Sequence, residues 1–181
     1  MNKYRTHNCS ELTKDNNGQE IILSGWINKK RDHGNLLFID LRDNYGVTQC
    51  TVDKSSSSFN HLEKIQLESV IKIKGKVVKR SKETINPELQ TGDIEVNIIS
   101  FEVLGTCSEL PMPVFSDQEY AEEIRLKYRF LDLRRKKIHE NIILRSKVIS
   151  FIRNKMIDSG FLEFQTPILT ASSPEGARDF L

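Results

Sequence analysis

The sequence predicts a mainly β barrel domain followed by a helical segment, and three observations support this fold class. Strand-like runs recur between turn residues from Glu20 to Cys107, with one helix-like interruption after the third run. Beyond Cys107 the pattern changes to a proline-containing, charged stretch, and then to a long amphipathic helix. We therefore expect a β domain at residues 1–107, a linker and hinge at 108–135, and the start of a further domain at 136–181.

Five strands are expected in the first part of the chain. In order they cover Ile21–Lys30, Leu36–Arg42, Val47–Val52, Val70–Lys79 and Ile94–Val103. The stretch Asp43–Gly46 contains the Asn and Gly that a tight reversal between two strands requires, and Gly75 marks a bend in the fourth strand.

The helix-like interruption begins after Ser58, which is expected to be its N-cap. Its apolar face would consist of Phe59, Leu62, Ile65 and Leu67. Three strands, a helix and two more strands are the elements of the OB-fold, a five-stranded Greek-key barrel. OB-folds commonly bind single-stranded nucleic acids or oligosaccharides across their second and third strands.

Composition excludes several classes of protein. No apolar run approaches the roughly 20 residues that cross a bilayer, and the N-terminus lacks the apolar core of a secretory signal, so a cytoplasmic location is expected. Cys9, Cys50 and Cys107 are odd in number and widely spaced, which favours reduced thiols over a disulfide framework or a metal site. The net charge of +2 is too small to indicate nucleic-acid binding by itself.

After the hinge, apolar residues recur at helical spacing from Lys136 to Ser159, and Gly160 is expected to end that helix. The following stretch FLEFQTPIL alternates as a strand would, up to Pro167. The sequence ends with nothing to cover this helix and strand. We therefore expect a second domain that is cut off soon after it begins.

Polar residues of the first hairpin suggest a binding face. The cations Lys29, Lys30 and Arg31 enter the hairpin, and Phe38 and Gln49 lie on its two arms. Recognition of single strands needs cations for phosphates, an aromatic ring for stacking and an amide for base edges. The alternative is a solvated basic turn with Phe38 in the core.

Two further regions carry polar residues of interest. Arg80 and Asn86 follow the fourth strand, and in an OB-fold that loop lies beside the same binding face. Near the end, SSPEGARDF places Glu175 where it is suited to receive an ammonium group, although a surface loop with scattered charges is the simpler interpretation. No catalytic triad, metal-ligand cluster or Walker loop occurs. The residues alone thus favour nucleic-acid binding and give no support to catalysis.

Three stretches resemble a known family. GWINKKRDHGNLLFIDLRDNYGVTQC, RLKYRFLDLRR and TPILTASSPEGARDFL resemble the anticodon-binding barrel, the hinge and the first class II motif of bacterial aspartyl-tRNA synthetases. Lysyl and asparaginyl enzymes share the barrel and a related hinge, but PEGARDF is typical of the aspartyl enzymes. The resemblance implies an OB-fold barrel, a hinge and the start of an α+β catalytic domain.

The resemblance also implies roles in anticodon recognition. Phe38 would stack on an anticodon base, and Gln49 would pair with the central uridine. Contacts with neighbouring bases or backbone are implied for Lys29, Arg31, Arg80, Asn86 and Glu95. The family usually has arginine where this chain has Lys29, so a bidentate contact there becomes a point charge.

A finer specificity is implied by His33. In the family, histidine followed by glycine at this loop position is typical of enzymes that charge both tRNA-Asp and tRNA-Asn, whereas leucine marks enzymes restricted to tRNA-Asp. Imidazole donates or accepts a hydrogen bond, and leucine does neither. Thr84 is assigned to the same discriminating region, although it matches neither habit of the family.

For the full-length protein the resemblance implies a ligase that activates L-aspartate with ATP and Mg²⁺ and transfers it to tRNA. Glu175 would bind the substrate's ammonium group, and the strand ending at Pro167 would belong to a homodimer interface. The ATP-binding arginines belong to later motifs, so this fragment is expected to be inactive and to bind no cofactor. The alternative is a stand-alone OB-fold module that binds tRNA or single strands, which would have no use for the long helix and the substrate loop.

Overall fold

The computed structural model describes residues 2–115 and 118–166. The chain divides into two compact units, Met1–Pro111 and Met112–Leu181. Pro167 and Glu175, to which the sequence assigns a dimer interface and a substrate site, lie outside the described residues.

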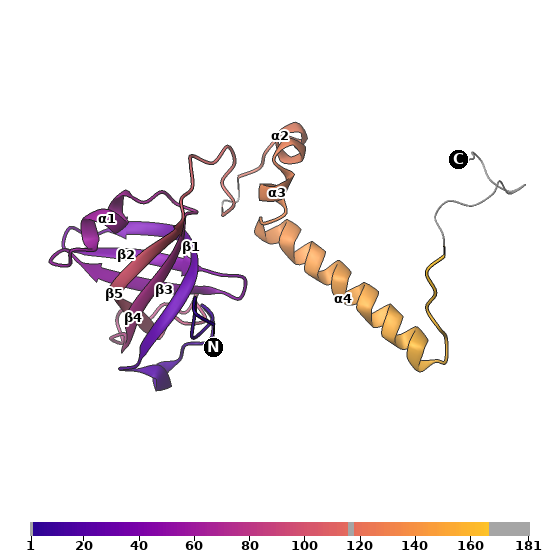
Figure 1. The fold of residues 1–181 in the computed structure, drawn as a ribbon, viewed down its shortest axis with the longest axis horizontal. Coiled ribbons are helices and arrows are strands. Elements are labelled where there is room, and N and C mark those ends of the chain that lie inside the picture. The colour runs from indigo at the N-terminus through magenta and orange to yellow at the C-terminus, as the bar shows by residue number, and fades with distance from the viewer. Residues whose placement is uncertain (1, 116–117, 167–181) are drawn as a thin grey trace, which may run out of the picture. The chain divides into compact units, whose positions relative to one another are not determined.

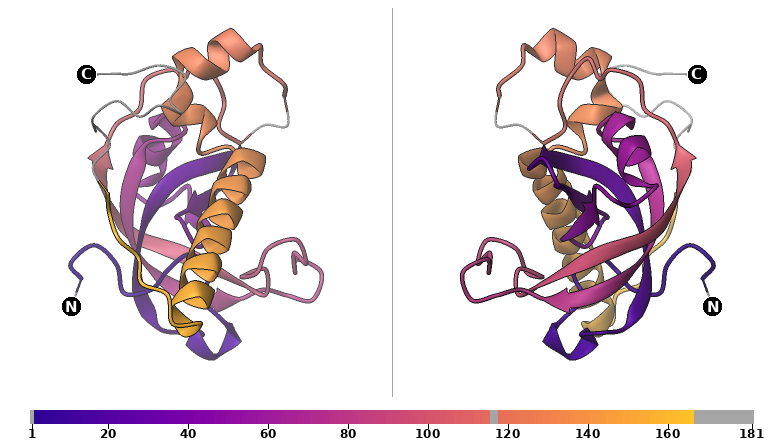
Figure 2. Two further views of the ribbon diagram at one scale, coloured as in Figure 1. Left: turned by 90° about the vertical axis from the view of Figure 1, so that its right-hand side faces the viewer. Right: turned by 90° about the vertical axis from the view of Figure 1, so that its left-hand side faces the viewer.

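The first unit is a closed five-stranded barrel (Figure 1). Its strands are β1 (Glu20–Asp32), β2 (Leu36–Arg42), β3 (Val47–Asp53), β4 (Val70–Lys79) and β5 (Ile94–Gly105). They are paired in the order β1-β2-β3-β5-β4 around the barrel. Only β3 and β5 pair in parallel among these neighbours; the other pairs are antiparallel. Figure 2 shows how the long strands curve around the closed sheet. The predicted OB-fold is confirmed.

Two short helices accompany the barrel: the 3-10 helix η1 (Lys14–Asn16) and the α-helix α1 (Phe59–Lys64), which follows β3. Phe59 and Leu62 of α1 join the barrel core, as predicted. The predicted apolar face was wrong at Leu67, which is 46% exposed because α1 already ends at Lys64. Ser58 is the N-cap residue, but its side chain makes no capping hydrogen bond.

The barrel interior is built from alternate residues of each strand. It contains, among others, Ile21, Leu23 and Ile27 of β1, Leu37, Ile39 and Leu41 of β2, and Ile71, Ile73 and Val77 of β4. The free thiols of Cys9 and Cys50 are also in the core, where burial raises the pKa of both. These two cysteines are therefore packing residues rather than reactive groups.

A register shift in β1 determines which of its later side chains face outward. Ile27 pairs with Leu41, but the next pair is Lys29 with Asp40, so Asn28 is an extra residue on the β1 side. A bulge of this kind reverses the inward and outward alternation of the residues that follow. Arg31 then pairs with Phe38 on the outer side, and Lys30 pairs with the buried Ile39 on the inner side.

Gly75 permits a close approach of β4 to β5. A Cβ atom at this position would lie 2.5 Å from Cγ1 of Val96 and 2.7 Å from the carbonyl oxygen of Asn97. The register between the two strands shifts between Lys74 and Gly75. Gly75, where the sequence predicts a bend, thus lies at this irregularity, and a side chain there would force the strands apart.

The second unit contains α2 (Glu122–Lys127), α3 (Arg129–Asp132) and α4 (Lys136–Asp158). Gly160, with φ of +88°, ends α4 as predicted, and the Phe161 N–H donates to the Met156 carbonyl over 3.1 Å. The strand expected after it is not formed at residues 161–166. A strand needs a neighbour for its N–H and C=O groups, and no strand occurs within residues 118–166.

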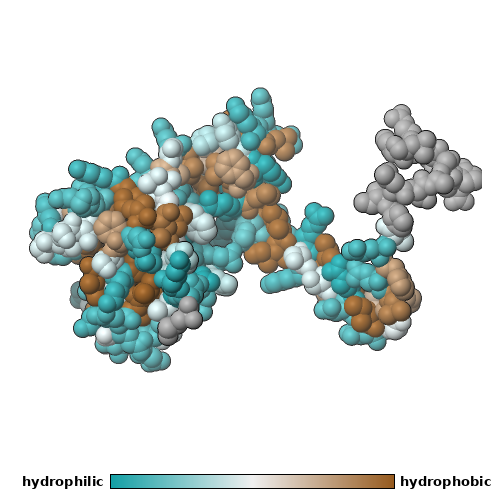
Figure 3. Space-filling view, viewed as in Figure 1, coloured by the Kyte–Doolittle hydropathy of each residue, from teal (hydrophilic) through white to brown (hydrophobic). Residues whose placement is uncertain are grey.

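The predicted apolar stripe of α4 is exposed in this unit. Large exposed side chains on α4 and just after it, including Ile152, Met156, Phe161 and Leu162, are 41 to 78% exposed. Figure 3 shows hydrophobic side chains at the surface of this segment. Such a surface is typical of an interface rather than of a solvated helix. None of the helices in the described residues is long and apolar enough to cross a membrane.

Candidate nucleic-acid interface

A groove of about 720 Å³ lies on the outer face of the barrel. Its walls come from β1, β2, β3, β5 and the two loops that follow β1 and β4. The residues that line it are Arg31, His33, Leu36, Phe38, Gln49, Arg80, Thr84, Asn86 and Glu95. Every barrel residue singled out from the sequence for anticodon binding or tRNA discrimination is among them, except Lys29.

Strand alternation explains the floor of the groove. Leu36 and Phe38 are two residues apart on β2 and are half-buried, while the intervening Leu37 is in the core. Phe38 is therefore not a core residue, which removes one part of the alternative interpretation of this hairpin. Its ring is available on the groove side, where a planar base is able to stack.

The ring of His33 lies against Phe38. The two ring centroids are 5.2 Å apart with an interplanar angle of 79°, which is an edge-to-face contact. His33 is exposed in the loop between β1 and β2, whose turn uses Gly34 with φ of +80°. The contact places an imidazole at the end of the stacking surface.

One guanidinium links two polar side chains on the groove floor. Nη2 of Arg31 donates to Oδ1 of Asp40 over 3.0 Å and to Oε1 of Gln49 over 3.1 Å. Asp40 and Gln49 are directly opposite each other on β2 and β3, and both are largely buried. Burial raises the pKa of the Asp40 carboxyl, and the charges of Arg31 and Lys29 act in the opposite direction.

Arg80 provides the second cation of the groove. Its side chain is only 3% exposed, and its Nη1 donates to the Thr84 carbonyl over 3.2 Å. Nε lies 3.9 Å from a carboxylate oxygen of Glu95. Within the described residues, Nε and Nη2 of Arg80 are buried and have no hydrogen-bond partner. Buried donors without acceptors are costly, so this arginine is suited to receive an acceptor from a ligand.

The lysines before Arg31 have different roles. Lys29 is exposed on the same side of β1 as Arg31, next to Asp40, although it does not line the groove. Nζ of Lys30 donates instead to carbonyls at the end of α1, including that of Ile65 over 2.6 Å. Lys30, which the sequence grouped with its two neighbours, is a structural residue.

Two residues of this face, one that lines the groove and one that binds Arg31 beneath it, were not identified from the sequence. Leu36 lines the groove, and Asp40 anchors Arg31 on its floor. The signal was available, because both are two residues from Phe38 on one strand and therefore share its face. Elsewhere in the described ranges, no three His, Cys, Asp or Glu side chains gather as a metal site would require.

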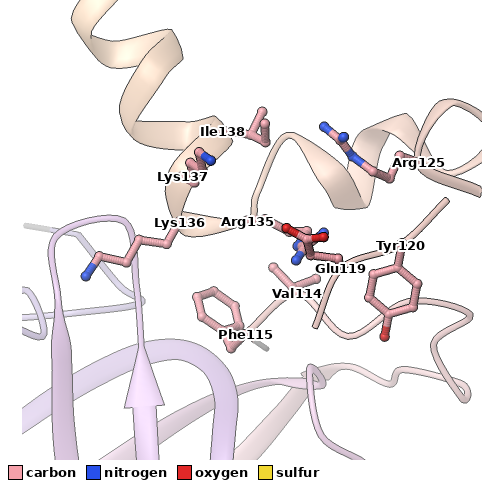
Figure 4. A pocket seen from close by; sticks show the side chains of 9 residues that line it. All are labelled: Val114, Phe115, Glu119, Tyr120, Arg125, Arg135, Lys136, Lys137 and Ile138. Carbon is pink, nitrogen blue, oxygen red and sulfur yellow. The ribbon is translucent and has the colours of Figure 1, made fainter. Parts of the chain in front are cut away.

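A second polar cluster occupies the hinge of the other unit. Asp132 is fully buried and accepts hydrogen bonds from Arg125 Nε, at 3.0 Å, and from Arg129 Nη1, at 2.5 Å. Hydrogen bonding from Arg125 lowers the pKa of the Asp132 carboxyl. Beside it is a pocket of about 610 Å³ whose lining includes Arg125, Arg135 and two lysines (Figure 4).

Both parts of the chain match models of known families. Residues 21–104 match the OB-fold nucleic acid binding domain, and residues 121–181 match the class II tRNA synthetases of the D, K and N group. The first part of the chain is thus an anticodon-binding OB domain, and the second is the start of a class II synthetase catalytic domain. This combination places the chain among the class II tRNA synthetases.

Within that class, relatives with high sequence identity over the whole of this chain are aspartate–tRNA(Asp/Asn) ligases. The chain is 83% identical over all 181 residues to the aspartate–tRNA(Asp/Asn) ligase of Pelagibacter ubique, and 60% identical to that of Phenylobacterium zucineum. It spans 30% and 31% of the length of these two relatives. The match to a catalytic domain favours the ligase hypothesis over the stand-alone module.

Solved structures agree with this assignment of the fold. The asparaginyl-tRNA synthetase of Pyrococcus horikoshii, complexed with asparaginyl-adenylate, matches 94% of this chain and 38% of its own, with a TM-score of 0.81 and 26% identity. The aspartyl-tRNA synthetase of Entamoeba histolytica matches 93% of this chain and 41% of its own, with a TM-score of 0.79 and 24% identity.

Proposed function

We propose that this chain is the anticodon-recognition part of an aspartate–tRNA ligase and that its groove binds the anticodon loop of tRNA-Asp and tRNA-Asn. The observation that carries the proposal is the groove itself, which combines an aromatic surface, two arginine cations and an amide. These are the groups that single-stranded RNA recognition requires. The 83% identical relative is an aspartate–tRNA(Asp/Asn) ligase, which supports both tRNAs as partners.

In this proposal each side chain of the groove has a role. Phe38 stacks on an anticodon base, and Gln49 binds the edge of the central one. Arg31, Arg80, Asn86 and Glu95 contact neighbouring bases or phosphates, and Lys29 adds a cation at the rim. Nε and Nη2 of Arg80, which have no hydrogen-bond partner within the described residues, favour an acceptor on the RNA.

His33 and Thr84 distinguish the last anticodon base, which differs between tRNA-Asp and tRNA-Asn. The contact between His33 and Phe38 supports this role, because it puts the imidazole beside the stacking surface. In stem-loop binding, His33→Leu is then expected to weaken the tRNA-Asn loop more than the tRNA-Asp loop. An equal loss on both loops would remove His33 from discrimination.

The whole protein, in this proposal, uses ATP with Mg²⁺ to activate L-aspartate, and Glu175 binds the ammonium group of that substrate. The class II family match supports the use of ATP. The protein forms a homodimer in which the apolar stripe of α4 and the segment ending at Pro167 are covered by the second subunit. The exposure of that stripe supports this part of the proposal.

The test measures binding of the 181-residue chain to an anticodon stem-loop with the tRNA-Asp sequence. Fluorescence anisotropy reports the binding at several salt concentrations. Phe38→Ala is expected to cost about 1 to 3 kcal/mol of binding free energy because a stacked base loses its platform. Tyr45→Ala is the matched control, since Tyr45 is an exposed aromatic in the next turn and does not line the groove. Equal effects of the two substitutions would contradict the assignment of the groove.

A further inference from the structure

Asp40 is the one buried acid on the groove floor to which the proposed function gives no role. Its side chain is 11% exposed, and its Oδ1 accepts from Nη2 of Arg31 over 3.0 Å. Burying a carboxylate is costly, and the pKa of this one is raised by its burial. The contacts of the buried Asp40 carboxylate therefore indicate what it does in the protein.

The contact that matters is the second one made by the same nitrogen. Nη2 of Arg31 has two hydrogens, of which one goes to Asp40 and the other to Oε1 of Gln49. A guanidinium has no acceptor, so a glutamine that faces it must present its oxygen. The Gln49 amide is therefore fixed with its oxygen toward Arg31, and its nitrogen remains for the groove that Gln49 lines.

This orientation has a chemical consequence for any base bound against Gln49. An NH₂ group donates hydrogen bonds, so it pairs with a keto oxygen and not with an exocyclic amine. Uracil and cytosine have nearly the same shape and stacking area, but uracil has a keto group at C4 where cytosine has an amine. The amide orientation alone is able to distinguish the two.

We propose that Asp40 is a positioning residue: through Arg31 it holds the Gln49 amide with its nitrogen toward the groove, so that the site selects uracil over cytosine. The inference rests on the proposed function, because it concerns how the same groove reads the anticodon. Asp40 does not touch the RNA in this mechanism. Without it, the Arg31 side chain, which is 38% exposed, has no anchor, and the amide is free to turn over.

The experiment measures selectivity rather than affinity. Two anticodon stem-loops that differ only in uracil or cytosine at the central position are titrated with the 181-residue chain. The wild-type chain is expected to prefer uracil by about tenfold, the size of effect that one well-placed polar contact gives. Asp40→Ala is expected to reduce that ratio at least about threefold, mainly through weaker binding of the uracil loop.

Three comparisons separate positioning from a general structural effect. Asp40→Asn retains an oxygen that accepts from Arg31 and should keep an intermediate ratio. In a Gln49→Ala background, Asp40→Ala should not change the ratio further, because the residue through which it acts is gone. Asp40→Ala that weakens both loops equally, or that lowers the ratio equally with and without Gln49, would overturn the proposal.

A second variant makes the test independent of how well Asp40→Ala folds. In Gln49→Glu the same guanidinium holds a carboxylate, which accepts hydrogen bonds and cannot donate them. The preference should then reverse toward cytosine, whose amine donates. A Gln49→Glu chain that still prefers uracil would overturn the amide orientation. Binding of neither loop by the wild-type chain would instead defeat the proposed function, whereas equal binding of both would defeat this inference alone.

Discussion

Two buried aspartates, Asp40 on the barrel face and Asp132 in the hinge, are each bound by arginine, but in opposite electrostatic situations. Asp132 accepts hydrogen bonds from Arg125 and Arg129, and its pKa is lowered. Asp40 accepts one from Arg31, which is shared with Gln49, and its pKa is raised. The first charge is stabilised by its own surroundings, and the second is not. We conclude that Asp132 and its arginines stabilise the hinge. The ionised Asp40 instead lowers the stability of the barrel while it orients a binding group.

The largest effect is expected at Asp132. Replacing it with asparagine removes an acceptor of charge-assisted hydrogen bonds in a fully buried position, which costs about 2 kcal/mol locally. Amides of α2 and α3 should then exchange with deuterium faster, while stem-loop binding by the barrel stays unchanged. Asp158→Asn, at the exposed end of α4, is the matched control and should have no such effect.

The pH dependence of the hinge follows from the sign of this shift. The pKa of Asp132 is lower in the folded state than in the unfolded state. The stabilisation that ionised Asp132 gives the folded hinge is therefore fully present above the pKa of the unfolded state, and it is lost as the pH falls through the pKa of the folded state. Smaller protection factors, which are corrected for the slower intrinsic exchange in acid, are therefore expected in α2 and α3 below about pH 4. If α2 and α3 lost the same protection from exchange in acid with and without the Asp132→Asn substitution, Asp132 would not stabilise the hinge, and it would no longer differ from Asp40 in this respect.

An intermediate effect should separate Lys30 from Lys29. Lys30→Met leaves the carbonyls at the end of α1 without their ammonium donor and should lower the free energy of unfolding by about 1 kcal/mol in urea titrations. Lys29→Met should change stability by less than about 0.5 kcal/mol but lower the salt dependence of RNA binding by about one ion. If Lys29→Met lowered stability and Lys30→Met changed only the salt dependence of binding, the bulge in β1 would be placed wrongly.

The smallest effect is expected for Asp40→Asn, and it has the opposite sign, because this substitution should raise the free energy of unfolding. A raised pKa in the folded state means that the ionised Asp40 costs stability at neutral pH, whereas its protonated form does not. The asparagine variant should thus be more stable at pH 7 by less than about 1 kcal/mol. The gain should disappear below about pH 4, where the carboxyl is protonated in both states. A loss of stability at pH 7 would show that the ion pair with Arg31 outweighs burial.

The sequence predicted the barrel well because period-two alternation is a local property. Once β2 was recognised, Phe38 and its neighbours two residues away had to share one face, and the loops after β1 and β4 followed from the OB-fold. Arg31, Phe38, Gln49, Arg80 and Asn86 were found in this way, whereas His33, Thr84 and Glu95 came from the family resemblance and Leu36 was missed. Lys30 was misassigned because a bulge depends on pairing between strands, which no single-strand pattern contains.

Two other differences between prediction and structure, one in each unit, have a different origin. Residues 161–166 have strand-like alternation, yet a strand forms only beside another strand. Ser58 is the N-cap residue of α1 as predicted, but its side chain makes no capping hydrogen bond, because that bond depends on a side-chain geometry that composition does not determine. In both cases the local preference was read correctly, and the missing information concerned neighbours.

The bulge in β1 means that this binding face is specified by residue number as much as by residue type. If Asn28 were paired in a regular ladder, every cation, aromatic ring and amide of the groove would remain in the sequence, but Lys29 and Arg31 would turn into the barrel and Lys30 out of it. Deleting Asn28 would instead restore regular pairing and leave Lys29 and Arg31 on the outer side. The extra residue at the bulge therefore determines on which side of the sheet the later residues of β1 lie. Sequence alignments of such barrels should for this reason count residues between the first strand and the first loop before they compare side chains.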